Sequence, residues 1–136
     1  PYNDISIKVL ATGIGGRITS FITSGIGVTG RFVVIPTGSD TGLSSRNGTT
    51  WSSTTFPSGG TWSCITSGRE EINGREIFVA LKLASPEAAY SYNGTSWTST
   101  TLPSNGPWRS VVYGDGAFVA VSDDGNEGAV SRDGIN

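Results

Sequence analysis

The stretch Ser91-Tyr92-Asn93-Gly94-Thr95-Ser96-Trp97 decides the fold, because the same pattern occurs elsewhere in the chain. An earlier copy is Ser45-Arg46-Asn47-Gly48-Thr49-Thr50-Trp51, and a later copy begins Ser131-Arg132-Asp133-Gly134. The offsets between the copies are 46 and 40 residues. A pattern that returns at periods of this length indicates a repeat architecture.

An apolar run before each copy supports the same interpretation. Phe32, Phe78 and Phe118 lie in these runs, and they are also 46 and 40 residues apart. Because two independent features share the same offsets, accidental similarity is a poor explanation. We therefore divide the chain into a leader, residues 1–17, and three repeats, residues 18–61, 62–107 and 108–136, the last of them incomplete.

Each repeat contains four short strand candidates separated by turn residues. In the second repeat these are residues 62–67, 76–83, 88–92 and 96–101. Asn-Gly and Asp-Gly between the last two strands predict two-residue type I′ hairpins, in which both central residues have positive φ. Gly114-Asp115-Gly116 predicts another tight turn in the third repeat. The central apolar strand has no polar face, which is expected of a strand buried between neighbouring sheets.

Four strands in a repeat of 40 to 46 residues predict an all-β fold made of β-propeller blades. Each blade would be a four-stranded antiparallel sheet. Three repeats are fewer than a propeller usually contains, so we expect the ring to be larger or shared between chains. An immunoglobulin-type sandwich also has short strands and tight turns, and it is the alternative architecture.

The repeated motif resembles the Asp-box, or bacterial neuraminidase repeat, of sialidase-like propellers. The usual pattern of that family is Ser-x-Asp-x-Gly-x-x-Trp, whereas here glycine follows the Asn or Asp directly. The surrounding sequence is closer to a looser variety found in phage tail or fibre proteins and in bacterial surface proteins. The resemblance implies a structural role for the motif, which we assign to these residues: Ser45, Asn47, Gly48, Trp51, Ser91, Asn93, Gly94, Trp97, Ser131, Asp133 and Gly134.

The composition excludes several kinds of chemistry. The 136 residues include no histidine and one cysteine, Cys64, and the chain has a formal net charge of −2. Imidazole catalysis, histidine metal ligands and multi-cysteine zinc sites are therefore absent. The net charge argues against a nucleic-acid partner, and no apolar run is long enough for a membrane span. We predict no cofactor and no metal; Asp123, Asp124 and Glu127 suggest a calcium loop only weakly, because their spacing departs from the EF-hand.

Two classes of function remain. The first is a non-enzymatic structural or recognition protein, such as part of a virion fibre or spike or a surface-exposed propeller, whose partners are copies of itself, other virion or surface proteins, or glycans. Candidate glycan contacts are Tyr92, Trp62 and Trp108, although tryptophan at a strand entry more often packs between blades. The second is a sialidase-like glycoside hydrolase. The resemblance would then imply an arginine triad, but Arg46 and Arg132 lie inside the turn motif, so we predict no catalytic residues.

The leader supplies one further expectation about assembly. Residues 5–10 alternate in the manner of a β-strand. This strand has no partner in its own repeat, and the third repeat lacks a fourth strand. We expect the leader to pair with another copy or with an element outside residues 1–136, so that deleting residues 1–10 weakens assembly more than it weakens the second and third repeats.

Overall fold

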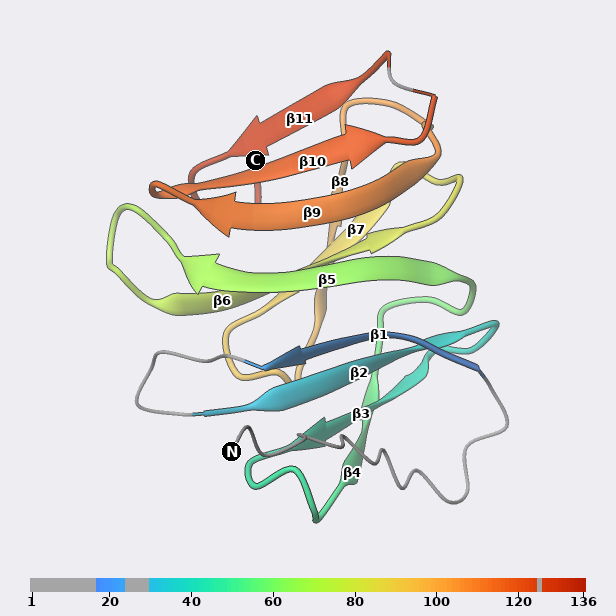
Figure 1. Ribbon diagram of the computed structural model, residues 1–136, viewed down its shortest axis with the longest axis vertical. Helices are drawn as coiled ribbons and strands as arrows, with labels where there is room; N and C mark the ends of the chain where they lie inside the picture. The colour runs from blue at the N-terminus through green and yellow to red at the C-terminus, as the bar shows by residue number, and fades with distance from the viewer. Residues whose placement is uncertain (1–16, 24–29, 125) are drawn as a thin grey trace, which may run out of the picture.

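The computed structural model describes residues 17–23, 30–124 and 126–136, and the regular secondary structure in these segments is entirely β. The strands form three antiparallel sheets that follow one another along the chain and stack side by side (Figure 1). The all-β prediction is therefore confirmed for the described residues. Residues 1–16 are not described, so the predicted leader strand lies outside the described residues.

The sheets are built from consecutive strands, each paired with the next. The first sheet contains β1 (Arg17–Thr23), β2 (Phe32–Thr37), β3 (Thr41–Ser45) and β4 (Ser52–Thr55). The second contains β5 (Trp62–Arg69), β6 (Glu76–Lys82), β7 (Glu87–Ser91) and β8 (Thr98–Thr101). The third contains β9 (Trp108–Gly114), β10 (Ala117–Ser122) and β11 (Gly128–Ser131).

The strand register confirms that the repeated phenylalanines are equivalent. In the first sheet Phe32 pairs with Ser45, and in the third Phe118 pairs with Ser131. Phe78 pairs with Ser91 in the same way in the second sheet. Each phenylalanine thus lies in the second strand of its sheet, opposite the serine that opens the turn motif.

The core consists of two apolar layers, one on each side of the second sheet. Strand β6 contributes to both, because its side chains alternate between the two faces of the sheet. Phe78 and Ala80 pack against the first sheet, and Val79 and Leu81 pack against the third. This arrangement confirms that β6 is apolar because it is covered on both faces.

Trp62 and Trp108 hold equivalent places at the start of the first strand of their sheets. Both are buried, with 0% and 1% of their surface exposed. Their indole N–H groups donate to the carbonyl oxygens of Ser58 and Ser104, each at 3.2 Å. The large ring fills the space between sheets, and the N–H group keeps a hydrogen bond that it would otherwise lose on burial.

Candidate functional site

The serine of each turn motif organises the backbone that follows it. Ser91 Oγ accepts hydrogen bonds from the N–H groups of Asn93 (3.3 Å) and Gly94 (2.8 Å). Asn93 Oδ1 in turn accepts from the N–H groups of Thr95 (2.9 Å) and Ser96 (2.8 Å). The turn therefore meets its backbone hydrogen-bonding needs with side-chain oxygens, as Asx turns do.

The same bonds recur in the other two copies. Gly48 donates to Ser45 Oγ at 2.9 Å, and Gly134 donates to Ser131 Oγ at 2.7 Å. The side-chain acceptor of the third copy is Asp133 Oδ1, which the Ile135 N–H meets at 2.8 Å. These contacts give the motif the local structural function that its residue types suggest.

The predicted type I′ geometry is wrong for these turns. Only the glycines have positive φ: 72° at Gly48, 68° at Gly94 and 74° at Gly134. The side-chain oxygen of the Asn or Asp binds the following N–H groups from an ordinary backbone conformation, so these residues need no left-handed strain. By contrast, Asp115 (φ 49°) and Gly116 (φ 75°) do form the predicted tight turn, with Gly114 paired to Ala117.

The tryptophan of the motif packs beside the repeated phenylalanine. The ring centroids of Trp51 and Phe32 are 6.4 Å apart and those of Trp97 and Phe78 are 6.5 Å apart, both edge-to-face at 61°. Each tryptophan thus ties its turn to the second strand of its own sheet. Trp97 also stacks on Phe56 of the preceding repeat, with centroids 4.4 Å apart.

The structure does not bring the candidate glycan contacts together on a surface. Trp62 and Trp108 are buried between sheets, so their proposed contact with sugars is wrong for the folded chain. Sequence position suggested exposure because both follow Pro- and Gly-containing loops, but the stacking of the sheets covers them. Their packing between sheets is the alternative that the residue type favoured from the start.

Tyr92 is the one partly exposed member of that set, and it belongs to a polar cluster. Its hydroxyl donates to Glu70 Oε2 at 3.1 Å, and the Arg75 guanidinium carbon lies 3.9 Å from the ring centroid. Burial and, after it, the Glu70 carboxylate raise the pKa of Tyr92. Because Arg75 covers one face of the ring, a sugar could stack only on the other face.

Each carboxylate of the acidic loop before β11 binds a different partner. Asp123 pairs with Arg109 at 3.1 Å, Asp124 accepts from the Ser122 hydroxyl, and Glu127 accepts from the Ser104 hydroxyl. Within residues 17–23, 30–124 and 126–136 no group of three or more potential His, Cys, Asp or Glu ligands converges. The Asp124 bond lies within the hairpin between β10 and β11, whereas the other two bonds connect this loop to β9 and to the segment that precedes β9.

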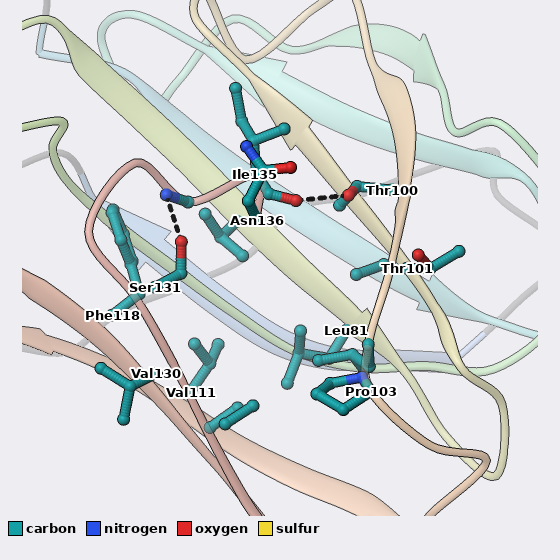
Figure 2. A pocket seen from close by; sticks show the side chains of 16 residues that line it. Leu81, Thr100, Thr101, Pro103, Val111, Phe118, Val130, Ser131, Ile135 and Asn136 are labelled. Atoms are coloured by element: carbon teal, nitrogen blue, oxygen red, sulfur yellow. Dashed lines mark hydrogen bonds between the residues drawn. The ribbon is translucent and has the colours of Figure 1, made fainter.

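An apolar hollow lies between the second and third sheets. It has a volume of about 260 Å³ and opens beside β8 and β11 (Figure 2). The residues that line it are mostly apolar, with hydroxyl and amide groups at the rim: Val79, Leu81, Ala88, Thr100, Thr101, Leu102, Pro103, Val111, Phe118, Ala120, Ala129, Val130, Ser131, Gly134, Ile135 and Asn136. Sequence reasoning missed this cavity, although the repeat register brings together the residues of the second and third repeats that line it.

Comparisons with known proteins do not distinguish between the two classes of function. No family model, curated protein or solved structure matches this chain. The described residues contain no helix with the length and apolar character that crossing a membrane requires. The features of the chain that bear on its function are therefore the sheets, their surfaces and the cavity.

Replacing Asp133 by asparagine should make the chain less sensitive to acid. Burial alone raises the pKa of Asp133, but the bonds from Asn136, Ile135 and Ser131 outweigh it and hold that pKa well below the usual value. A carboxyl whose pKa falls on folding stabilises the fold above its unfolded pKa, about 3.9, and loses this contribution as the pH drops further. We expect urea midpoints of Asp133→Asn to fall less between pH 5 and pH 2, in rough terms, than those of the parent chain.

Asn47 and Asn93 show that asparagine fits this turn. Both make the same two N–H contacts through Oδ1. Asp40→Asn, in an exposed turn, is the control for loss of a carboxylate elsewhere. Equal acid sensitivity of Asp133→Asn and the parent chain would contradict the assignment.

Proposed function

We propose that this chain is a non-enzymatic structural or recognition module whose sheets are blades of a β-propeller. The three sheets follow one another along the chain, and their first strands β1, β5 and β9 lie next to each other (Figure 1). Antiparallel sheets in this order, each entered by its inner strand, are what successive blades would provide. We infer a virion fibre or spike, or a cell surface, as the setting, on the resemblance of the repeats.

One observation carries the proposal: the outer face of the third sheet is apolar and exposed. Val112, Val119, Val121 and Val130 are exposed by 57%, 37%, 46% and 68%. Val119 pairs with Val112 on one side and with Val130 on the other, so three of these side chains form a row across the sheet. Contiguous apolar side chains on a sheet face indicate an interaction surface.

The second sheet shows what such a face does in this chain. Val79 and Leu81 occupy the positions that correspond to Val119 and Val121, and they are buried by the third sheet, with exposures of 6% and 1%. The same strand position is thus used to stack one sheet on the next. By this comparison the valine face, defined as Val112, Val119, Val121 and Val130, is suited to receive a further sheet.

The net charge of the chain agrees with a role in assembly with other proteins. A net charge of −2 offers no electrostatic attraction to nucleic acid. We infer partners that present β-sheets, either copies of this chain or other virion or surface proteins. Glycan recognition would have to use Tyr92 or surfaces that sequence reasoning did not single out, because Trp62 and Trp108 are buried.

Placing a charge on the valine face should disrupt assembly without unfolding the chain. Val119→Asp puts a carboxylate in the centre of the row, and burying an unpaired charge in an interface costs several kcal/mol in rough terms. We expect the parent chain to self-associate with rising concentration in sedimentation velocity, and Val119→Asp to associate at least about tenfold more weakly.

Ile72→Asp is the matched control, because Ile72 is 81% exposed, lies in the turn between β5 and β6 of the second sheet, and is not one of the four valines of that face. It should sediment like the parent chain. Circular dichroism of both variants checks that the sheets persist. A parent chain that remains monomeric at all accessible concentrations, or a Val119→Asp variant that associates as the parent does, would rule out self-assembly through this face.

A further inference from the structure

The chain contains four Asn-Gly dipeptides, at residues 47–48, 73–74, 93–94 and 105–106. Such dipeptides are chemically reactive in water. The glycine nitrogen can attack the side-chain carbon Cγ of the asparagine before it, because glycine has no side chain to obstruct the approach. The attack requires a glycine N–H group that is not engaged elsewhere and an asparagine side chain that can turn toward it.

The reaction is deamidation, and it converts asparagine to an acid. The glycine nitrogen forms a bond to Cγ while the bond from Cγ to Nδ2 breaks. The glycine proton leaves with the amide nitrogen as ammonia, and a cyclic imide remains. Water then opens the imide at either of its carbonyl carbons and gives aspartate or isoaspartate. In sum, water is consumed, ammonia is released and a negative charge is gained, without oxidation or reduction.

The turn motif holds both of the groups that would react. The Gly48 and Gly94 N–H groups donate to Ser45 Oγ at 2.9 Å and to Ser91 Oγ at 2.8 Å. The asparagine Oδ1 atom of each copy accepts two further backbone N–H groups at 2.8 and 2.9 Å. These bonds must break before the nitrogen can reach Cγ. A reaction that requires local opening proceeds only in the fraction of molecules that are open.

Asn105 has none of these restraints. It is exposed and lies in the segment between β8 and β9. Within the part of the chain that the structure describes, neither its side-chain amide nor the Gly106 N–H has a hydrogen-bond partner. Asn73 is intermediate, because its Nδ2 donates to Glu70 Oε1 at 3.2 Å and the Gly74 N–H donates to the Glu70 carbonyl at 3.0 Å. Asn105 is therefore the least restrained of these asparagines.

We propose that Asn105 is the residue at which the folded chain deamidates first, and that the serine of the turn motif protects Asn47 and Asn93 from the same reaction. The motif then has a chemical role besides its structural one. Its turns use Asn-Gly for their shape, and the serine hydroxyl keeps that dipeptide intact. The inference goes beyond the proposed assembly role and does not depend on it.

Modification at Asn105 would disturb the way in which Trp108 is held. The Ser104 carbonyl accepts the Trp108 indole N–H at 3.2 Å, and the Gly106 carbonyl accepts the Trp108 backbone N–H at 2.9 Å. Isoaspartate lengthens the backbone by a methylene group between these two carbonyls. The new carboxylate also adds a negative charge next to Ser104, whose hydroxyl already binds Glu127. Deamidation at Asn105 should therefore loosen the entry to the third sheet.

The test is incubation of the full chain in mildly alkaline buffer, followed by peptide mapping with mass spectrometry, which measures each asparagine separately. A parallel incubation in concentrated urea gives the rate for the unfolded chain at each site. We expect the folded rate at Asn105 to lie within about threefold of its urea rate, and those at Asn47 and Asn93 to fall at least about tenfold below theirs. Faster reaction at Asn47, Asn73 or Asn93 than at Asn105 in the folded chain would overturn the assignment.

Two matched variants test the protective role of the serine. Ser45→Ala removes the acceptor of the Gly48 N–H and should raise the rate at Asn47 at least about fivefold while leaving Asn93 unchanged. Ser91→Ala should do the reverse. Each variant contains its own control, because a chain that merely unfolds more often would react faster at both sites. Equal acceleration at both sites, or acceleration at neither, would show that the serine does not protect its own turn.

A third variant connects the modification to stability. Asn105→Gln removes the reactive asparagine, and glutamine forms the corresponding cyclic imide much more slowly because its ring is larger. After long incubation the parent chain should show a lower urea midpoint by circular dichroism, in step with deamidation at Asn105, whereas Asn105→Gln should keep its midpoint. An unchanged midpoint of the fully deamidated parent chain would contradict the expected effect on Trp108.

Discussion

Replacing Trp108 by alanine is expected to lower the free energy of unfolding by about 3–5 kcal/mol. Trp108 is 1% exposed and lies between the second and third sheets. Truncation removes the ring from this layer, leaves a cavity, and deprives the Ser104 carbonyl of the indole N–H donor. A loss of this size is a large fraction of the stability of an ordinary domain.

Urea denaturation followed by circular dichroism measures the effect. Trp62→Ala should cost about as much as Trp108→Ala, because Trp62 is equally buried and makes the same bond to Ser58. Trp97→Ala should cost less, since Trp97 is only half-buried and packs at the rim of its layer. A loss under about 1 kcal/mol for Trp108→Ala would contradict the packing role, on the usual scale of core truncations.

The repeat pattern predicted the strands well because it depends on local chemistry. The register that pairs Phe78 with Ser91 follows from alternation in β6 and from the turn motif that fixes where β7 ends. The backbone conformation of Asn93 was not predictable from the Asn-Gly dipeptide alone. The decisive factor was Ser91, whose hydroxyl competes for the N–H groups of the turn and makes a longer loop favourable.

The candidate site was harder to predict because it depends on how sheets stack. Trp62 and Trp108 follow Pro- and Gly-containing loops in sequence, yet stacking of the sheets buries them. Val79 and Val119 stand at equivalent positions in similar strands, but one is covered and the other exposed. Only the number of neighbouring sheets distinguishes them. The cavity is likewise visible only when Thr100 and Phe118, from different sheets, are seen together (Figure 2).

Replacing Gly94 by alanine should destabilise the chain much more than the same change at Gly48. Both glycines occupy the same place in the turn motif, with φ of 68° and 72°. An alanine at either position meets the same left-handed strain, roughly 1–2 kcal/mol. The two sites differ in the space that a Cβ atom would find.

At Gly94 a Cβ atom would lie 2.5 Å from Arg31 Cδ and 2.9 Å from Val33 Cγ2, whereas at Gly48 the nearest atoms belong to Phe32, at 3.7 Å. Arg31 has a flexible side chain, but Val33 is fully buried and cannot withdraw without disturbing the layer between the first two sheets. Overpacking of this kind adds about 1–3 kcal/mol. We therefore expect urea denaturation to give a loss of about 1–2 kcal/mol for Gly48→Ala and about 2–5 kcal/mol for Gly94→Ala. Equal losses would show that backbone strain alone governs the motif and that the turn of the second repeat does not lock against the first sheet.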